Sequence, residues 1–247
     1  MKLTCITVCL NSEKTIERTF LSVLNQTKPI YEYLVIDGVS TDKTLDIVKK
    51  YQEKFKEKKI IFKTISEKDN GLYDAMNKAV LMARGDYLIF MNSDDTFFQN
   101  DVIQKAEPNL DNDVIYGNSV ISFKNKKEEM RISKDINAIN QHLPFIPQSC
   151  FVKTCIQKQF LFNTNYKISA DYDSYLRMYQ SGIKFKKIDL TISRFYYGGI
   201  SNKNEWNTYK EDIKVKLNHG VLKRNIFLFF RILRRWIIIK LKGAKNG

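Results

Sequence analysis

The stretch YLIFMNSDDTF, residues 87–97, decides the fold that we expect for this chain. Its first five residues are apolar and predict a short buried strand, which Asn92, Ser93, Asp94 and Asp95 follow at once. A carboxylate at the edge of a core is costly unless a partner offsets its charge. The two acids therefore either cap a turn or hold a cation.

Strand and helix patterns alternate on both sides of this stretch. Strands are predicted at 3–10, 32–37, 60–65, 87–91 and 113–117, and helices at 13–26, 42–57, 71–84 and 99–107. A hairpin of strands 118–124 and 128–133, a helix at 171–181, strands near 184–188 and 190–196 and a helix at 204–219 follow. Short apolar strands between helices are typical of an α/β fold with a mostly parallel, Rossmann-like sheet flanked by helices.

The composition is that of a globular protein with a sizeable core: 247 residues, of which 43% are hydrophobic and 28% charged. Met1 and Lys2 lead directly into the first strand, so we expect no signal peptide. None of the four cysteines forms a C-x-x-C pair, which favours reduced thiols and a cytoplasmic protein.

Positive charge is concentrated at the C-terminus. The net charge is +14, and residues 223–247 supply eight Lys and Arg side chains and no acid. We therefore divide the chain into a catalytic domain, 1–220, and a basic amphipathic helix, 221–247. Arg231, Arg234 and Arg235 interrupt its apolar run, so we expect it to lie on an anionic membrane surface rather than to span a bilayer. Packing against the body or a homodimer partner is the alternative.

Polar clusters follow four of the predicted strands. They are Asn11 with Glu13, Asp37 to Asp42, Ser66 to Gly71 with Asp69 and Asn70, and Asn92 to Asp95. Loop polarity or helix capping would explain any one cluster. The carboxyl ends of parallel strands are where ligands bind in open α/β sheets, so the four together indicate a ligand site.

The site carries acids rather than a phosphate-binding loop. No G-x-x-x-x-G-K-[ST] motif occurs, and the Gly198-Gly199 pair lies far from the first strand. Carboxylates reach a diphosphate through a hard divalent cation such as Mg²⁺ or Mn²⁺. We therefore expect the acids to hold a metal ion that binds phosphates.

Four longer segments carry a family resemblance from about residue 3 to 200. They are ITVCLNSEKTIERTFLSVLNQT (6–27), YLVIDGVSTDKTLDIVKKY (33–51), the run from Ser66 to Asp95 that ends in NSDD, and ISADYDSYLRM (168–178). Together they resemble a bacterial family 2 glycosyltransferase of the GT-A fold, in the nucleotide-diphospho-sugar transferase superfamily.

The resemblance implies a role for each polar cluster. Asp171 stands at the position of the catalytic base, and Asp94 with Asp95 at that of the Mn²⁺ or Mg²⁺ ligands. The implied nucleotide-sugar contacts are Asn11, Glu13, Asp37, Asp69, Asn70 and Asn92. Three positions depart from the family pattern: Asn92 replaces the first acid of D-x-D, Leu10 replaces a frequent Tyr, and Pro147 replaces a frequent His.

The implied function is an inverting, metal-dependent transfer of a hexose or N-acetylhexosamine from a nucleotide sugar. We expect the nucleotide to be UDP. The acceptor would be a lipid-linked or surface glycan, as in lipopolysaccharide, O-antigen or capsule, at the inner face of the cytoplasmic membrane. A nucleotidyltransferase would need a glycine-rich phosphate loop that residues 9–15 do not supply. A non-catalytic protein that binds nucleic acid or membrane is the other alternative; the tail's cations lie beside aliphatic side chains, so we expect no nucleic acid partner.

Overall fold

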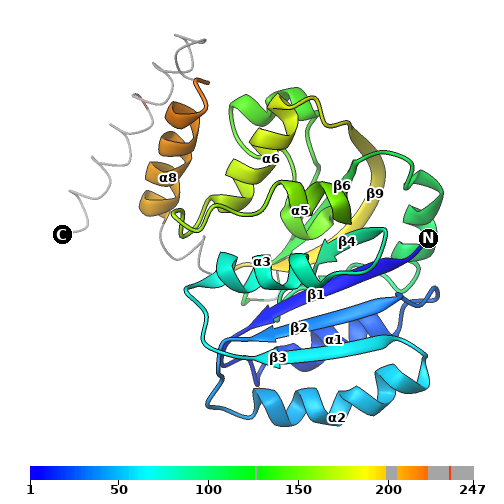
Figure 1. Cartoon of the computed structure of the whole chain (residues 1–247). Coiled ribbons are helices and arrows are strands. Elements are labelled where there is room, and N and C mark those ends of the chain that lie inside the picture. Colours follow the sequence, from blue (N-terminus) through cyan, green and yellow to red (C-terminus); the bar gives the residue numbers. More distant parts are fainter. Residues whose placement is uncertain (126, 199–204, 222–233, 235–247) are drawn as a thin grey trace.

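The computed structural model describes residues 1–125, 127–198, 205–221 and 234, and its helices and strands form layers around one sheet (Figure 1). The strands are β1 (Leu3–Cys9), β2 (Glu32–Asp37), β3 (Ile61–Ser66), β4 (Tyr87–Phe90), β5 (Thr96–Phe97), β6 (Val114–Ser122), β7 (Glu128–Arg131), β8 (Cys150–Lys153) and β9 (Phe185–Tyr196). The α-helices are α1 (Ile16–Leu24), α2 (Thr44–Glu57), α3 (Leu72–Met82), α4 (Val102–Ala106), α5 (Thr154–Gln159), α6 (Ala170–Gln180) and α8 (Glu205–Asn218).

The sheet has the order β3-β2-β1-β4-β8-β6-β9-β5, and β7 pairs with the C-terminal part of β6. Strands β3, β2, β1 and β4 are mutually parallel, so their carboxyl ends lie along one edge. β8 runs antiparallel to both β4 and β6, which makes β6 parallel to the first four strands. The predicted α/β class with a mostly parallel sheet is therefore confirmed.

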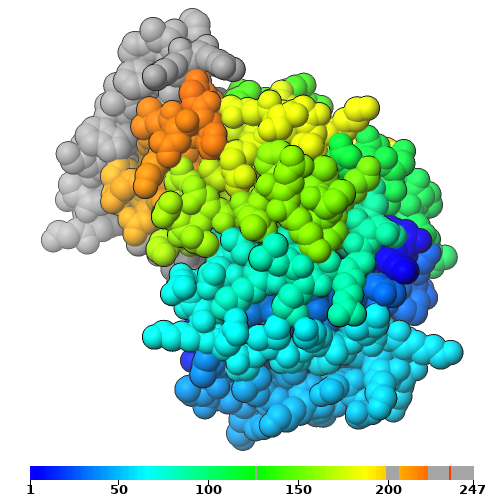
Figure 2. Space-filling view, in the orientation of Figure 1, coloured from blue at the N-terminus to red at the C-terminus, as the bar shows by residue number. Residues whose placement is uncertain are grey.

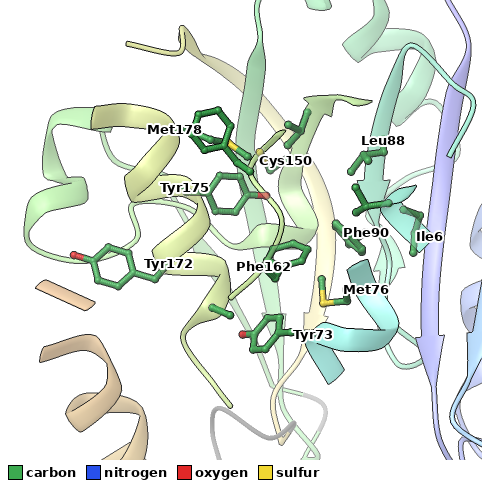
Figure 3. Close-up of a cluster of buried hydrophobic side chains, with 14 of the residues drawn as sticks. Ile6, Tyr73, Met76, Leu88, Phe90, Cys150, Phe162, Tyr172, Tyr175 and Met178 are labelled. Carbon is green, nitrogen blue, oxygen red and sulfur yellow. The ribbon is translucent and has the colours of Figure 1, made fainter. Parts of the chain in front are cut away.

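Two apolar layers cover the faces of this sheet. On one face, Phe20 of α1 and Phe55 of α2 pack with Tyr33 of β2, and all three side chains are fully buried. On the other face, α3 and α6 bury Met76 and Tyr175 near Phe90 of β4 (Figure 3). Burial on both faces explains why the strands β1, β2 and β4 are buried at every residue.

The second half of the chain differs from the prediction in detail. β6 and β9 are each one long strand where two were predicted, and β5, β8 and α5 were not predicted. β6 continues through Gly117 because this residue lets β9 approach closely: a Cβ there would lie 2.3 Å from the Leu190 carbonyl oxygen. A side chain at this position would force the two strands apart.

The predicted C-terminal helix lies outside the described residues, apart from Val221 and Arg234. Among the helices that are described, none combines the length and the apolar character needed to cross a bilayer. All four cysteines are free thiols, and three of them are buried.

Candidate functional site

A cavity of about 1330 Å³ lies at the edge where the parallel strands end. The loops after β1, β2, β3 and β4 line it, together with the start of α6. The predicted site residues on its wall are Asn11, Glu13, Asp69, Asn92, Asp94, Asp95 and Asp171. Residues up to 160 positions apart along the chain are thus brought to one space by the parallel strand order.

Helix α1 holds the acidic turn that follows β4. The turn closes with a hydrogen bond of 3.0 Å from the Asp95 N–H to the Asn92 carbonyl. The Thr19 hydroxyl donates to the Asp95 carbonyl at 2.8 Å, and Arg18 Nε donates to the Asp94 carbonyl at 3.0 Å. These bonds fix the backbone of the turn against α1.

Two side-chain oxygens in this turn lack a partner among the described residues: Asn92 Oδ1 and Asp95 Oδ2 are both buried and accept no hydrogen bond. Asp95 Oδ1 accepts the Tyr196 N–H at 3.0 Å. Burial and, next, the neighbouring Asp94 raise the pKa of Asp95 well above its usual range. Burial also raises the pKa of Asp94, against the opposing charge of Arg18. Such a cluster of desolvated oxygens is stabilised by a cation.

The donor atoms fit a hard divalent ion, since all of them are oxygens. Within the described ranges, no three side chains of His, Cys, Asp or Glu lie close enough together to hold an ion by themselves. Asn92 would therefore complete a set with Asp94 and Asp95, and its unpartnered Oδ1 is available for that purpose.

Asp171 lies in the first turn of α6, and Ser169, not Asp171, is the N-cap residue. The Tyr172 N–H donates to Asp171 Oδ1 at 2.7 Å. Burial raises the pKa of Asp171 from 3.8 to about 7; the Tyr172 N–H opposes this rise, and the Asp212 carboxylate adds to it. A carboxyl group on a cavity wall with a pKa near neutrality is suited to accept a proton.

The residues expected at the nucleotide are arranged in two layers. Asn11 and Glu13 line the cavity and also hold the loop after β2, because Asn11 Oδ1 accepts the Thr41 N–H and Glu13 accepts the Lys43 N–H.

Asp37 lies beneath Asn11 and Glu13 and is not part of the cavity wall. It is fully buried and accepts bonds from the Ser40 N–H and hydroxyl and from the Ser66 hydroxyl at 2.6 Å. Its position supports the loop geometry, and its contact with a nucleotide stays a prediction.

The loop after β3 places its two predicted residues differently. Asp69 lines the cavity, and Lys78 Nζ holds its carboxylate at 2.6 Å. Asn70 is exposed and is not among the residues that line the cavity; its N–H donates to Asp74.

Arg18 was not predicted as a site residue. Its guanidinium lies 3.6 Å above the Tyr196 ring, and it lines a second cavity of about 570 Å³ that shares Asp94 with the first. In the sequence it is one polar residue within a predicted amphipathic helix, and nothing local to it indicates proximity to residue 94.

Comparisons with known proteins identify the family of the chain. The profile described as Glycosyl transferase family 2 matches residues 4–168, more than half of the chain. The PGL/p-HBAD biosynthesis glycosyltransferase of Mycobacterium tuberculosis is 25% identical over 225 residues, which cover 87% of this chain and 83% of that protein. The poly(ribitol-phosphate) beta-glucosyltransferase of Bacillus spizizenii is 27% identical over 207 residues, covering 80% of this chain and 32% of the relative.

Solved structures share the fold. S. aureus TarS 1-349 in complex with UDP superposes with a TM-score of 0.66 at 23% identity, over 85% of this chain and 63% of that one. The mannosyltransferase PcManGT from Pyrobaculum calidifontis, in complex with GDP-Man and Mn²⁺, superposes with a TM-score of 0.63 at 16% identity, over 86% of this chain and 64% of that one. The chain thus spans less than two thirds of either solved chain. The GT-A fold expected from the sequence is confirmed, and the chain belongs to glycosyl transferase family 2 and is a glycosyltransferase.

Proposed function

We propose that this enzyme transfers a hexose or N-acetylhexosamine from a UDP-sugar to a hydroxyl group of a growing surface glycan, with inversion at the anomeric carbon. The observation that carries this proposal is that Asp94 and Asp171, 77 positions apart in the sequence, line the same cavity. Asp94 belongs to an oxygen-rich turn suited to a cation, and burial raises the pKa of Asp171 to about 7, which suits a base. TarS, which shares the fold, has been solved with UDP and with UDP-GlcNAc.

The donor end of the cavity would be formed by the loops after β1, β2 and β3. Asn11, Glu13 and Asp69 line it, and Asp37 fixes the backbone of the loop after β2. Asn92, Asp94 and Asp95 would hold Mn²⁺ or Mg²⁺, which as a Lewis acid neutralises charge on the leaving diphosphate. Arg18 fixes the turn that carries these three residues.

Asp171 would act on the acceptor. As the acceptor oxygen bonds to the anomeric carbon, its proton passes to the Asp171 carboxylate, and the bond from that carbon to the diphosphate oxygen breaks. A single displacement of this kind inverts the anomeric configuration. General base catalysis contributes about 10²–10⁴-fold to the rate.

The acceptor is proposed to be lipid-linked, which agrees with a basic tail that binds anionic membrane. Each Lys or Arg near such a surface contributes about 1 kcal/mol. Family membership favours this transferase over a nucleotidyltransferase and over a protein without catalysis.

A thermal-shift panel of nucleotide sugars with and without Mn²⁺ tests the donor site. Ligands that bind the native state raise Tm, and at saturation we expect the correct UDP-sugar with Mn²⁺ to raise it by about 5 °C or more. Asp94→Ala should abolish the Mn²⁺-dependent part of the shift. Asp111→Ala is the matched control, because Asp111 is 61% exposed, pairs with Lys186 and precedes β6 at the opposite edge of the sheet. A panel without any shift, or an unchanged shift in Asp94→Ala, would contradict the proposed donor site.

A further inference from the structure

Helix α8 binds the segment that leads into α6. The Glu211 carboxylate accepts hydrogen bonds from three successive backbone N–H groups, those of Lys167, Ile168 and Ser169, at 2.8 to 3.0 Å. Three N–H groups that converge before a helix form a site for an anion. Here the anion is a side chain of α8, so the start of α6 depends on a residue 42 to 44 positions further along the chain.

Further contacts join the start of α6 to α8 and to His219, the residue that follows α8. Asp212 Oδ1 accepts the Ser169 hydroxyl at 2.7 Å, and Ser169 is the N-cap residue of α6. His219 Nε2 lies 2.8 Å from Asp173 Oδ1, and Arg177 holds the other oxygen of Asp173 at 2.9 Å. In the figures α8 lies beside α6 and in direct contact with it (Figures 1 and 2).

Asp171 lies two residues beyond Ser169, the N-cap residue that Asp212 holds. The titratable groups that interact with Asp171 are Tyr73 of α3 and Asp212 of α8. Glu211 acts on Tyr73, Lys167 lines the same cavity, and Lys216 of α8 lies over the neighbouring Tyr172 ring. On its own helix, Asp173 is turned toward Arg177 and His219. Asp212 is thus the acid that faces Asp171 from a neighbouring helix, and its charge opposes ionisation of Asp171.

We propose that α8 is the positioning element of the active site: Glu211 fixes the backbone before α6, and Asp212 holds its N-cap, so that the Asp171 carboxyl is kept at the cavity wall. Glu211 and Asp212 are positioning residues, since both act through residues 167–171. The proposal rests on Asp171 as the base of the proposed function.

Two isosteric variants separate charge from geometry. Asp212→Asn keeps an acceptor for the Ser169 hydroxyl and removes the negative charge. Glu211→Ala removes the acceptor of the three backbone N–H groups, and Glu211→Gln restores a side-chain oxygen at a similar distance from the backbone of α8. Asp111→Asn is the matched control for the loss of an acid, because it lies at the opposite edge of the sheet.

The test is a ¹³C NMR titration of the Asp171 carboxyl carbon, which is identified by its loss in Asp171→Asn. We expect a midpoint near 7 in the unchanged protein, a lower midpoint in Asp212→Asn and no change in Asp111→Asn. Amide exchange at residues 167–169 should rise by about tenfold or more in Glu211→Ala and recover in part in Glu211→Gln, because exchange reports local opening.

Kinetics complete the test. Asp212→Asn should move the acid limb of the pH profile of kcat/KM to lower pH, and Glu211→Ala should lower kcat with donor binding unchanged. An unmoved Asp171 midpoint in Asp212→Asn together with unchanged exchange in Glu211→Ala would overturn the proposal. Full transfer by Asp171→Asn would instead refute the proposal that Asp171 is the catalytic base. The NMR and exchange results would still decide the role of α8.

Discussion

Burial of Asp171 lowers the stability of the folded protein at high pH and suits the proposed role of this residue as a base. It is held in a desolvated position by a loop that α8 fixes, and its pKa is raised to about 7. For an acid, a folded-state pKa above the unfolded value means that the group stabilises the fold only while protonated. Its contribution is complete below about pH 4 and is lost as pH rises through 7.

We therefore expect Asp171→Asn to be more stable than the unchanged protein at pH 8, on the order of 1–3 kcal/mol, and similar to it at pH 4. Asparagine keeps an oxygen for the Tyr172 N–H and cannot ionise. Urea unfolding at the two pH values measures the difference. A gain that is equal at both pH values would show that ionisation of Asp171 is not its cause.

Arg18 offers a second prediction at this scale. It fixes the Asp94 carbonyl and stacks on Tyr196, so Arg18→Gln should loosen the turn that carries the proposed ligands. Loss of such supporting contacts weakens metal affinity by about 10–100-fold. Mn²⁺ titration of activity measures this, with Arg84→Gln, whose side chain is 67% exposed, as control. Equal Mn²⁺ dependence in both variants would contradict the role of Arg18.

The sequence placed individual site residues with uneven success, for a physical reason. Asn92, Asp94 and Asp95 follow a short apolar strand directly, so their position at the sheet edge follows from local order. Asp37 also ends a strand, yet hydrogen bonds from Ser40 and Ser66 hold its carboxylate below the cavity. Arg18 reaches the site through helix packing, which no local pattern encodes.

At the scale of elements, the first four parallel strands and the hairpin of β6 and β7 were predictable, and the short antiparallel strands β5 and β8 were not. β1, β2, β3 and β4 are separated by helices with clear apolar periodicity. β8 has four residues and β5 has two, and both depend on pairing with strands distant in the sequence. Such short strands carry too little pattern to be separated from loops.

Gly117 is the element-scale test of how β6 and β9 fit together. Gly117→Ala should destabilise the fold by about 2–3 kcal/mol, because the added methyl group meets the Leu190 carbonyl and must displace a strand. Gly182→Ala is the comparison: its Cβ meets nothing within 4 Å, and only its φ of +79° costs about 1 kcal/mol. Thermal unfolding ranks the two, and an equal or smaller effect at Gly117 would contradict the close approach.

At the scale of the whole molecule, the positive charge is concentrated in the C-terminal tail. Residues 223–247 provide eight of the basic side chains, and the body retains a smaller excess. If the tail binds anionic membrane, co-sedimentation with phosphatidylserine vesicles should fall by about tenfold or more when Arg231, Arg234 and Arg235 are replaced by Glu. Added salt should have the same effect. Unchanged binding by the triple variant would assign membrane contact to another surface.

The fold brings Asp94 and Asp171 to one cavity, and one comparison tests most directly whether this cavity holds both the donor and the base. Donor binding by calorimetry and transfer rate should be measured together for the unchanged enzyme and for Asp171→Asn, with the UDP-sugar and Mn²⁺ identified by thermal shift. We expect the variant to bind the donor with the same Kd and to lose turnover by about 10²-fold or more. Transfer at the unchanged rate would contradict the assignment of Asp171 as the base that works in this cavity.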